Sequence, residues 1–322
     1  MKDMINKIKA VVIGHAVGDA LGVPAEFFSR DELDKYPICE MEGYGTYEVP
    51  KGTWSDDTSM SLAALDSLAK GKIDYLEIMK NFAKWLDGGE YTPFGDCFDV
   101  GRTCMTAINK FMFWYVSDKK ERPEFTAFEF GQSGERDNGN GSLMRIHPFS
   151  LMTWFRPELK SDFERIIDEA SALTHAHGRS KLACRIYTVI LQHLLSYPDK
   201  KSIFEALDTA KSRYADHSEY SHYARLLGGN FDKTLRDDIR SSGYVVDTLE
   251  AAVWCLLTTD SYKECVLKAV NLGEDTDTVA AIAGGLAGAL YGYDSIPEEW
   301  RNILAGHEYI EEMCDRACEA WK

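Results

Sequence analysis

Two short segments of the chain concentrate acidic and hydroxyl side chains directly before apolar, helix-forming stretches. They are Ser55-Asp56-Asp57-Thr58 and Asp275-Thr276-Asp277-Thr278. Carboxylate and hydroxyl oxygens with no neighbouring His or Cys suit hard cations such as Mg²⁺, Mn²⁺ or Ca²⁺ better than Zn²⁺. Adjacent helical positions diverge by about 100°. Asp56 and Asp57 are therefore suited to hold different ions or to bridge a pair, as in two-metal sites with ions about 3.5–4 Å apart.

Each cluster alone also has a simpler interpretation as a helix cap. Ser, Thr and Asp are favoured N-cap residues, and the helix dipole stabilises acidic side chains in a first turn by roughly 0.3–1 kcal/mol. A cap needs only one oxygen, however, and neighbouring carboxylates repel each other. Two such clusters in one chain therefore favour a shared cation site. Gly284, Gly285 and Gly288 on the later helix would let backbones approach closely enough to form it.

A third acidic candidate is Glu26, which ends the segment GDALGVPAE after a turn at Pro24. It is equally interpretable as a surface residue that follows a turn. The longest polar loop is GQSGERDNGNGS, residues 131–142. Polar loops on a rigid scaffold are where binding residues concentrate.

The elements that would position these side chains have a helical period. Apolar residues recur at intervals of three and four, and alternating strand patterns are scarce. The best strand candidate, residues 45–49, is weak. No repeat or linker divides the chain, so we expect one all-α domain over residues 1–322. We expect helices that begin near Ile5 and near Asp56, and helices over residues 73–86, 98–113, 163–173, 179–195, 202–214, 248–257, 262–271, 276–291 and 298–322.

Composition and charge limit the partners and the compartment that we expect for this chain. The 36 Lys and Arg residues against 52 Asp and Glu residues give a formal charge of -16, which repels nucleic acid and anionic lipid, so we expect neither as a partner. Eight cysteines without a CxxC pair are typical of reduced thiols in a cytoplasmic protein. His15 and Asp19 interrupt the N-terminal apolar stretch, which argues against a signal peptide. The apolar segment 279–291 is too short to span a bilayer.

Four motifs occur in a specific order: GDALGVPAEF, WSDDTSM, NGNGSLMR and GEDTDTVAAIAGGLAGALYG. In this combination the chain resembles the ADP-ribosylglycohydrolases, which include dinitrogenase reductase-activating glycohydrolases and ADP-ribosylarginine and ADP-ribosylserine hydrolases. The resemblance extends from about residue 5 to residue 293. It implies a compact all-α domain of orthogonally packed helices. It also implies an enzyme that uses two Mg²⁺ or Mn²⁺ ions to remove ADP-ribose from a modified protein or a small ADP-ribose conjugate.

The resemblance also assigns roles to individual residues. The implied metal ligands are Ser55, Asp56, Asp57, Asp275, Asp277 and Thr278. The implied substrate-binding residues are Gly139, Asn140, Gly141, Ser142 and His175, because backbone N–H groups of a Gly-rich loop can receive a pyrophosphate. Glu26 and Asp99 are the candidates for proton transfer. His175 is equally interpretable as a histidine at the end of a helix.

The segment Asp99-Val100-Gly101-Arg102-Thr103 resembles an element of the arginine-type and dinitrogenase reductase-type members, and so favours an arginine-like, N-glycosidic linkage. Asp99 as a helix cap is the alternative interpretation. The chain departs from the family pattern at three positions: Ser55 replaces the commoner Thr, Glu274 a common Gly, and Arg102 a common Asn. None of these changes removes a metal ligand.

Three other functions remain open at this point. The chain could be a non-catalytic ADP-ribose-binding relative that keeps the scaffold. It could hydrolyse serine-linked ADP-ribose or free esters such as O-acetyl-ADP-ribose. A helical protein-interaction domain would explain the helices but not the oxygen ligands at two helix starts.

Overall fold

The computed structural model describes residues 2–117 and 124–322, in which there is no β-strand. Fourteen α-helices form this part of the chain. They are α1 (Lys2–Gly22), α2 (Arg30–Lys35), α3 (Asp56–Leu68), α4 (Tyr75–Gly88), α5 (Arg102–Val116), α6 (His147–Phe155), α7 (Phe163–Ala172), α8 (Gly178–Ser196), α9 (Lys200–Tyr214), α10 (Val245–Leu257), α11 (Tyr262–Val270), α12 (Thr276–Tyr291), α13 (Glu298–Ile303) and α14 (His307–Ala320).

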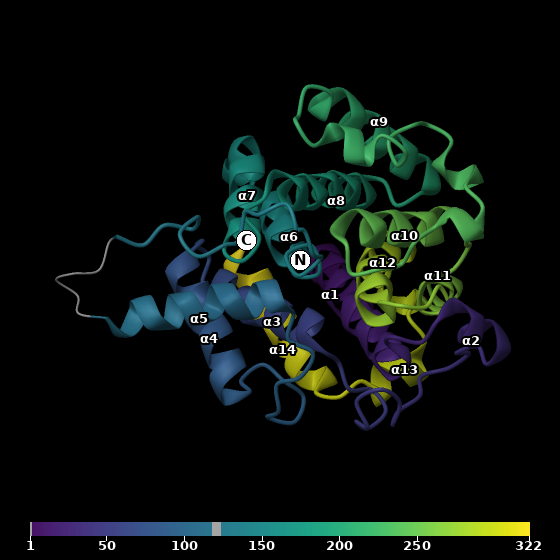
Figure 1. The fold of residues 1–322 in the computed structure, drawn as a ribbon, viewed down its shortest axis with the longest axis horizontal. Helices are drawn as coiled ribbons and strands as arrows, with labels where there is room; N and C mark the ends of the chain where they lie inside the picture. The colour runs from purple at the N-terminus through teal and green to yellow at the C-terminus, as the bar shows by residue number, and fades with distance from the viewer. Residues whose placement is uncertain (1, 118–123) are drawn as a thin grey trace.

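Helices α1 and α12 lie side by side at the centre of the fold (Figure 1). Small residues bring their backbones into contact: a Cβ atom added at Gly18 would lie 2.1 Å from the Ala280 carbonyl oxygen, and one at Gly288 would lie 1.9 Å from the Ala10 carbonyl oxygen. By length and composition α1 could cross a membrane, but 94% of its apolar window is buried inside the protein. Glycine and alanine thus set the distance between the helix that leads to Glu26 and the helix that begins with the second acidic cluster.

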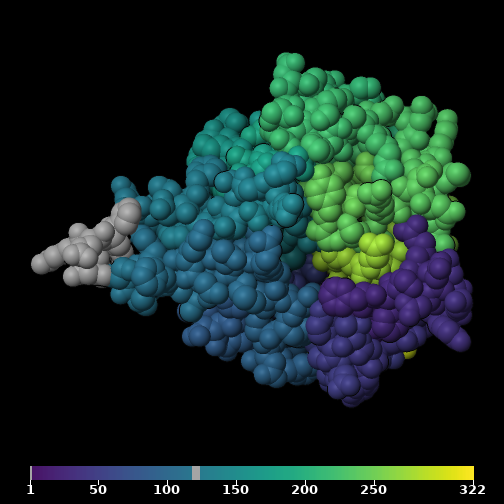
Figure 2. All heavy atoms as spheres, in the orientation of Figure 1, coloured from purple at the N-terminus to yellow at the C-terminus, as the bar shows by residue number. Residues whose placement is uncertain are grey.

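The other helices surround this pair. Helices α10 and α11 pack against α12, α3 and α14 pack against α1, and α8 separates the centre from α9 (Figure 1). The buried apolar side chains form one continuous cluster. The space-filling view shows a hollow where the purple N-terminal segment, the blue and teal segments and the yellow-green segment of α12 meet (Figure 2).

Several expected elements differ from the structure. The helix expected over 98–113 begins only at Arg102, because Asp99 has a φ of +52°, outside the helical region. The helix expected over 298–322 is two helices, which separate near Gly306, where φ is +63°. The weak strand candidate at 45–49 is not a strand: Thr46 donates its N–H to the Pro24 carbonyl in a turn-rich segment. Helices α2 and α6 were not expected.

Candidate active site

The first acidic cluster opens α3, and a carboxylate from inside α1 caps that helix. Asp19 is fully buried. Its Oδ1 accepts from the Ser55 N–H at 2.9 Å, and its Oδ2 accepts from the N–H and the hydroxyl of Thr58 at 3.0 and 2.6 Å. The Ser55 hydroxyl oxygen accepts a hydrogen bond from the Asp57 N–H at 3.3 Å. Because Asp19 and Ser55 satisfy these N–H groups, Asp56 and Asp57 are not needed as caps.

The second cluster opens α12, and it meets the first. Asp275 is the N-cap residue, yet its side chain makes no capping hydrogen bond. Its Oδ2 instead accepts from the Asn140 side-chain amide at 2.8 Å. The Thr278 hydroxyl donates to Asp57 Oδ2 at 3.3 Å, across the two clusters. The convergence expected from the sequence is therefore present.

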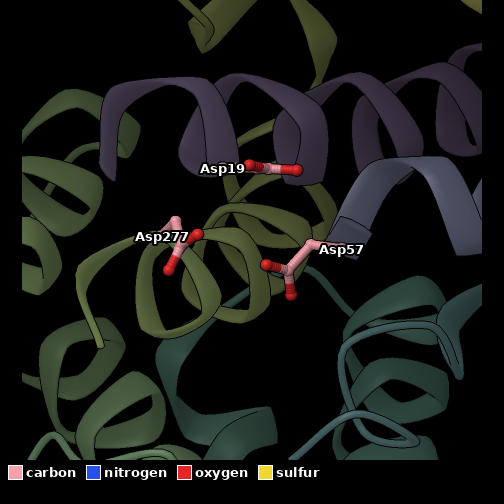
Figure 3. Close-up of side chains that lie close together, drawn as sticks. All are labelled: Asp19, Asp57 and Asp277. Carbon is pink, nitrogen blue, oxygen red and sulfur yellow. The ribbon is translucent and has the colours of Figure 1, made fainter. Parts of the chain in front are cut away.

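Carboxylate groups from three helices face one small volume. One oxygen each of Asp19, Asp57 and Asp277 lies within 4.8 Å of the other two, and these side chains come from α1, α3 and α12 (Figure 3). A second such group consists of Glu26, Asp99 and Asp277. Asp277 belongs to both groups, so it is the carboxylate that the two groups share.

The test of a metal site is whether these oxygens have other partners. Glu26 Oε2, Asp57 Oδ1, Asp275 Oδ1 and Asp277 Oδ2 are buried and accept no hydrogen bond from residues 2–117 or 124–322. Burying an unpaired carboxylate is costly unless it is protonated or coordinates a metal. All-oxygen ligands without His or Cys fit a hard divalent cation. Asp19 already accepts three hydrogen bonds, so we interpret it as a residue that orients the ligands.

The electrostatics of the cluster agree with this interpretation. Burial, together with the charge of Asp99, raises the pKa of Glu26 to about 9. Burial first and then the neighbouring carboxylates raise the pKa values of Asp57 and Asp277 well above their usual range. A divalent cation among them would favour the ionised forms and reverse these shifts.

A cavity of about 230 Å³ adjoins the cluster. Glu26, Asp56, Asp99, Asp275 and Thr278 contribute to its wall, as do Gly139, Asn140, Gly141, His175 and Arg102. Figure 2 shows the hollow into which it opens. Ser142 does not line the cavity: its hydroxyl is buried behind the loop and accepts from the Ser171 hydroxyl at 2.9 Å.

Two alternative interpretations of acidic residues are wrong. Glu26 is not a surface residue, because only 5% of it is exposed. Asp99 is not the cap of α5, because Gly101 holds the N-cap position. His175 lies beyond the end of α7, is buried, and faces the cavity.

The structure shows why glycine is common at position 274 and what Arg102 contacts at position 102. Glu274 has a φ of +64°, a conformation that glycine adopts without strain. Its backbone exchanges hydrogen bonds with the segment after Glu26: Phe27 N–H to Glu274 O at 2.7 Å, and Glu274 N–H to Phe28 O at 2.8 Å. Arg102 donates to Asp137 at 3.0 Å, at the edge of the cavity.

Sequence reasoning missed two residues. Asp19 could have been found, because it is a charged residue in the small-residue stretch of α1, where an unpartnered carboxylate would be costly. Tyr47 could not: its hydroxyl faces Glu26 and Asp99 and lowers both of their pKa values, against the larger effect of burial. Its ring packs on Phe98 with centroids 4.9 Å apart.

Known proteins resemble this chain over most or all of its length. The family model described as ADP-ribosylglycohydrolase matches residues 1–322. The chain belongs to the ADP-ribosylglycohydrolase family. ADP-ribosylarginine hydrolase Tri1 of Serratia proteamaculans is 33% identical over 317 residues, which cover 98% of this chain and 79% of that protein. ADP-ribosyl-[dinitrogen reductase] glycohydrolase of Rhodospirillum rubrum is 34% identical over 295 residues, which cover 91% and 88%.

A solved structure titled "ADP-ribosylglycohydrolase-related protein complex" superposes with a TM-score of 0.80 at 26% identity and covers 100% of both chains. The expected all-α ADP-ribosylglycohydrolase fold and the expected hydrolase class are therefore confirmed.

Proposed function

We propose that this ADP-ribosylglycohydrolase cleaves the N-glycosidic bond between ADP-ribose and an arginine side chain of a protein, with two Mg²⁺ or Mn²⁺ ions. The observation that supports it most strongly is the convergence of two acidic clusters, with unpartnered buried oxygens, on a cavity that Glu26 and Asp99 also line. The linkage rests on the Asp99 segment and on relatives named for arginine and dinitrogen reductase substrates.

The donor set for the ions consists of Ser55, Asp56, Asp57, Asp275, Asp277 and Thr278. When bound, divalent cations would polarise the oxygens that they coordinate and fix the orientation of the ribose. Asp19 would keep this set in place by holding the first turn of α3. Asn140 would do the same for Asp275.

The remaining residues act on the glycosidic bond itself. Departure of the guanidine builds positive, oxocarbenium-like charge on the ribose, and the carboxylates of the cavity wall would stabilise this charge. Hydrolysis requires one proton for the leaving nitrogen and removes one from the attacking water. Glu26 and Asp99, which face each other with raised pKa values, are placed to exchange these protons.

The experiment uses three substrates: peptides ADP-ribosylated on arginine, peptides ADP-ribosylated on serine, and O-acetyl-ADP-ribose. Released ADP-ribose is measured by chromatography with EDTA and after Mg²⁺ or Mn²⁺ is restored. We expect metal-dependent release, fastest from the arginine peptide, and loss of turnover in Asp56→Asn and Asp277→Asn with the fold intact. Faster release from the serine peptide or from O-acetyl-ADP-ribose would contradict the arginine linkage and identify that substrate instead. ADP-ribose binding without any turnover would indicate a binding protein.

A further inference from the structure

A guanidinium group is fully enclosed behind the substrate loop. Arg145 lies three positions after Ser142, the last residue of the NGNGS motif, and is 0% exposed. Its Nη1 donates to the Ala170 carbonyl at 3.1 Å and its Nη2 to the Thr174 hydroxyl at 2.7 Å, whereas its Nε has no partner in the part of the chain that the structure describes. Within residues 2–117 and 124–322, no carboxylate is among the groups that shift the pKa of Arg145.

A buried charge without a counter-ion is expensive to maintain. Burial lowers the pKa of Arg145, but a guanidinium stays charged in proteins. The ring of Phe82, 4.9 Å from the Arg145 Cζ, gives only partial compensation. A leucine or methionine would fill such a position at lower cost, so the charge and its hydrogen-bonding geometry point to a role in the site.

Arg145 reaches the cavity through one intermediate residue. The Thr174 hydroxyl lies 2.8 Å from His175 Nδ1. A guanidinium can only donate hydrogen bonds, so the Thr174 oxygen accepts from Arg145 and its own hydrogen is free for Nδ1. When the Thr174 hydroxyl donates this hydrogen to Nδ1, a neutral His175 carries its proton on Nε2.

The Nε2 atom is the one that faces the substrate loop. A Cβ atom added at Gly139 or at Gly141 would lie 3.6 Å from it, and His175 lines the cavity beside both glycines. Burial, followed by the charges of Arg145 and Arg102, lowers the pKa of His175 to about 3, which keeps the ring neutral. A neutral ring with the proton on Nε2 donates one hydrogen bond into the cavity.

The charges around the cavity are segregated. Glu26, Asp56, Asp99 and Asp275 form the acidic part of its wall, where cations and ribose would sit. The part formed by His175 and the two glycines has no acidic side chain in the described cavity lining, and Arg145 lies behind it. An anionic group would therefore be attracted to the His175 side, despite the net charge of -16 on the chain.

We propose that Arg145 is a positioning residue for the diphosphate of the substrate: through Thr174 it holds His175 as an Nε2–H donor, and its unpaired charge makes this wall attractive to an anion. This inference rests on the proposed function, because it takes ADP-ribose as the ligand. It assigns to the arginine of the NGNGSLMR motif a role in binding that its complete burial conceals.

The test removes the Thr174 hydroxyl, which connects Arg145 to His175; we call these three residues the relay. Thr174→Val keeps the shape and deletes the hydroxyl, Thr174→Ser keeps the hydroxyl, and Thr188→Val deletes another buried hydroxyl, which pairs with Ser150. Calorimetry with free ADP-ribose should show about tenfold weaker binding for Thr174→Val. The other two variants should bind within about twofold of the wild type. In turnover, Thr174→Val should raise KM and leave kcat nearly unchanged, because the reacting bond lies at the acidic side.

Nitrogen-15 NMR of the His175 ring provides a readout independent of binding. We expect the Nε2–H tautomer in the wild type and in Thr174→Ser, and a mixture in Thr174→Val. The relay is overturned if Thr174→Val binds ADP-ribose as tightly as the wild type, or if the wild type has the Nδ1–H tautomer. A wild-type protein that neither binds nor releases ADP-ribose would instead overturn the proposed function. Arg145→Met, if it folds, should lose affinity at least as far as Thr174→Val.

Discussion

The contact between α1 and α12 offers a direct way to perturb the site without touching a functional side chain. A Cβ atom added at Gly22 would lie 2.3 Å from the Asp277 Cα and 2.4 Å from its N. Gly22 has φ −83° and ψ −34°, which alanine adopts freely. Gly22→Ala therefore adds no backbone strain of its own, and its effect is a steric push on the backbone of Asp277.

The size of that push follows from the contact distance. Ordinary van der Waals contacts of a Cβ atom begin at about 3.4 Å, so the Asp277 backbone must retreat by about 1 Å from its 2.3 Å separation. Asp277 belongs to both carboxylate groups. A displacement of about 1 Å at a catalytic constellation reduces the rate roughly 100-fold. Overpacking of a core contact also costs about 1–3 kcal/mol of stability.

The assay must separate this displacement from simple destabilisation. Gly288→Ala provides the matched control, because its Cβ would lie 1.9 Å from the Ala10 carbonyl oxygen, about 16 Å further along α12. We expect both variants to melt at lower temperature, and only Gly22→Ala to lose turnover per folded molecule and affinity for Mn²⁺. Gly88→Ala, where a Cβ would meet nothing within 4 Å, should leave both unchanged. Equal turnover in Gly22→Ala and Gly288→Ala would refute the reasoning.

Three further predictions concern the same region. Asn140→Ala removes the amide that donates to Asp275 at 2.8 Å and orients it, so Mn²⁺ affinity measured by calorimetry should fall about 10–100-fold. Glu274→Gly relieves a φ of +64°, so the free energy of unfolding in urea should rise by about 1 kcal/mol. Because burial raises the pKa of Glu26 from 4.5 to about 9, the metal-free protein should lose stability between these pH values, as the unfolded carboxyl ionises and the buried one resists. Melting curves in EDTA should show this decline, and saturating Mg²⁺ should reduce it.

Local pattern predicted the elements that bear the acidic clusters. The expected bounds of α12, residues 276–291, agree with the structure because hydroxyl and acidic residues start the helix and Gly292 follows it. The convergence of both clusters was predictable because one carboxylate suffices for a cap and each segment has two. The glycines of α12 indicated the close approach that Gly18 and Gly22 complete from α1.

What could not be predicted depends on contacts between distant segments. Asp99 interrupts an apolar period with a left-handed backbone, and only the surrounding structure selects that conformation. Gly306 reads as an ordinary glycine within a periodic stretch, yet its φ of +63° separates α13 from α14. The role of Asp19 arises from N–H groups that lie 36 and 39 residues away in sequence.

The capping of α3 by Asp19 connects the fold to the chemistry. If Asp56 and Asp57 had to satisfy the N-terminal N–H groups of α3, their oxygens would be occupied and unable to coordinate a cation. Asp19 takes that task from a neighbouring helix, and the α1–α12 contact fixes its position. The four buried oxygens that accept no hydrogen bond from the described residues are then available to protons or to cations. Cation binding would therefore stabilise the fold as well as complete the site, since a cation that favours the ionised, assembled cluster binds the folded chain in preference to the unfolded one.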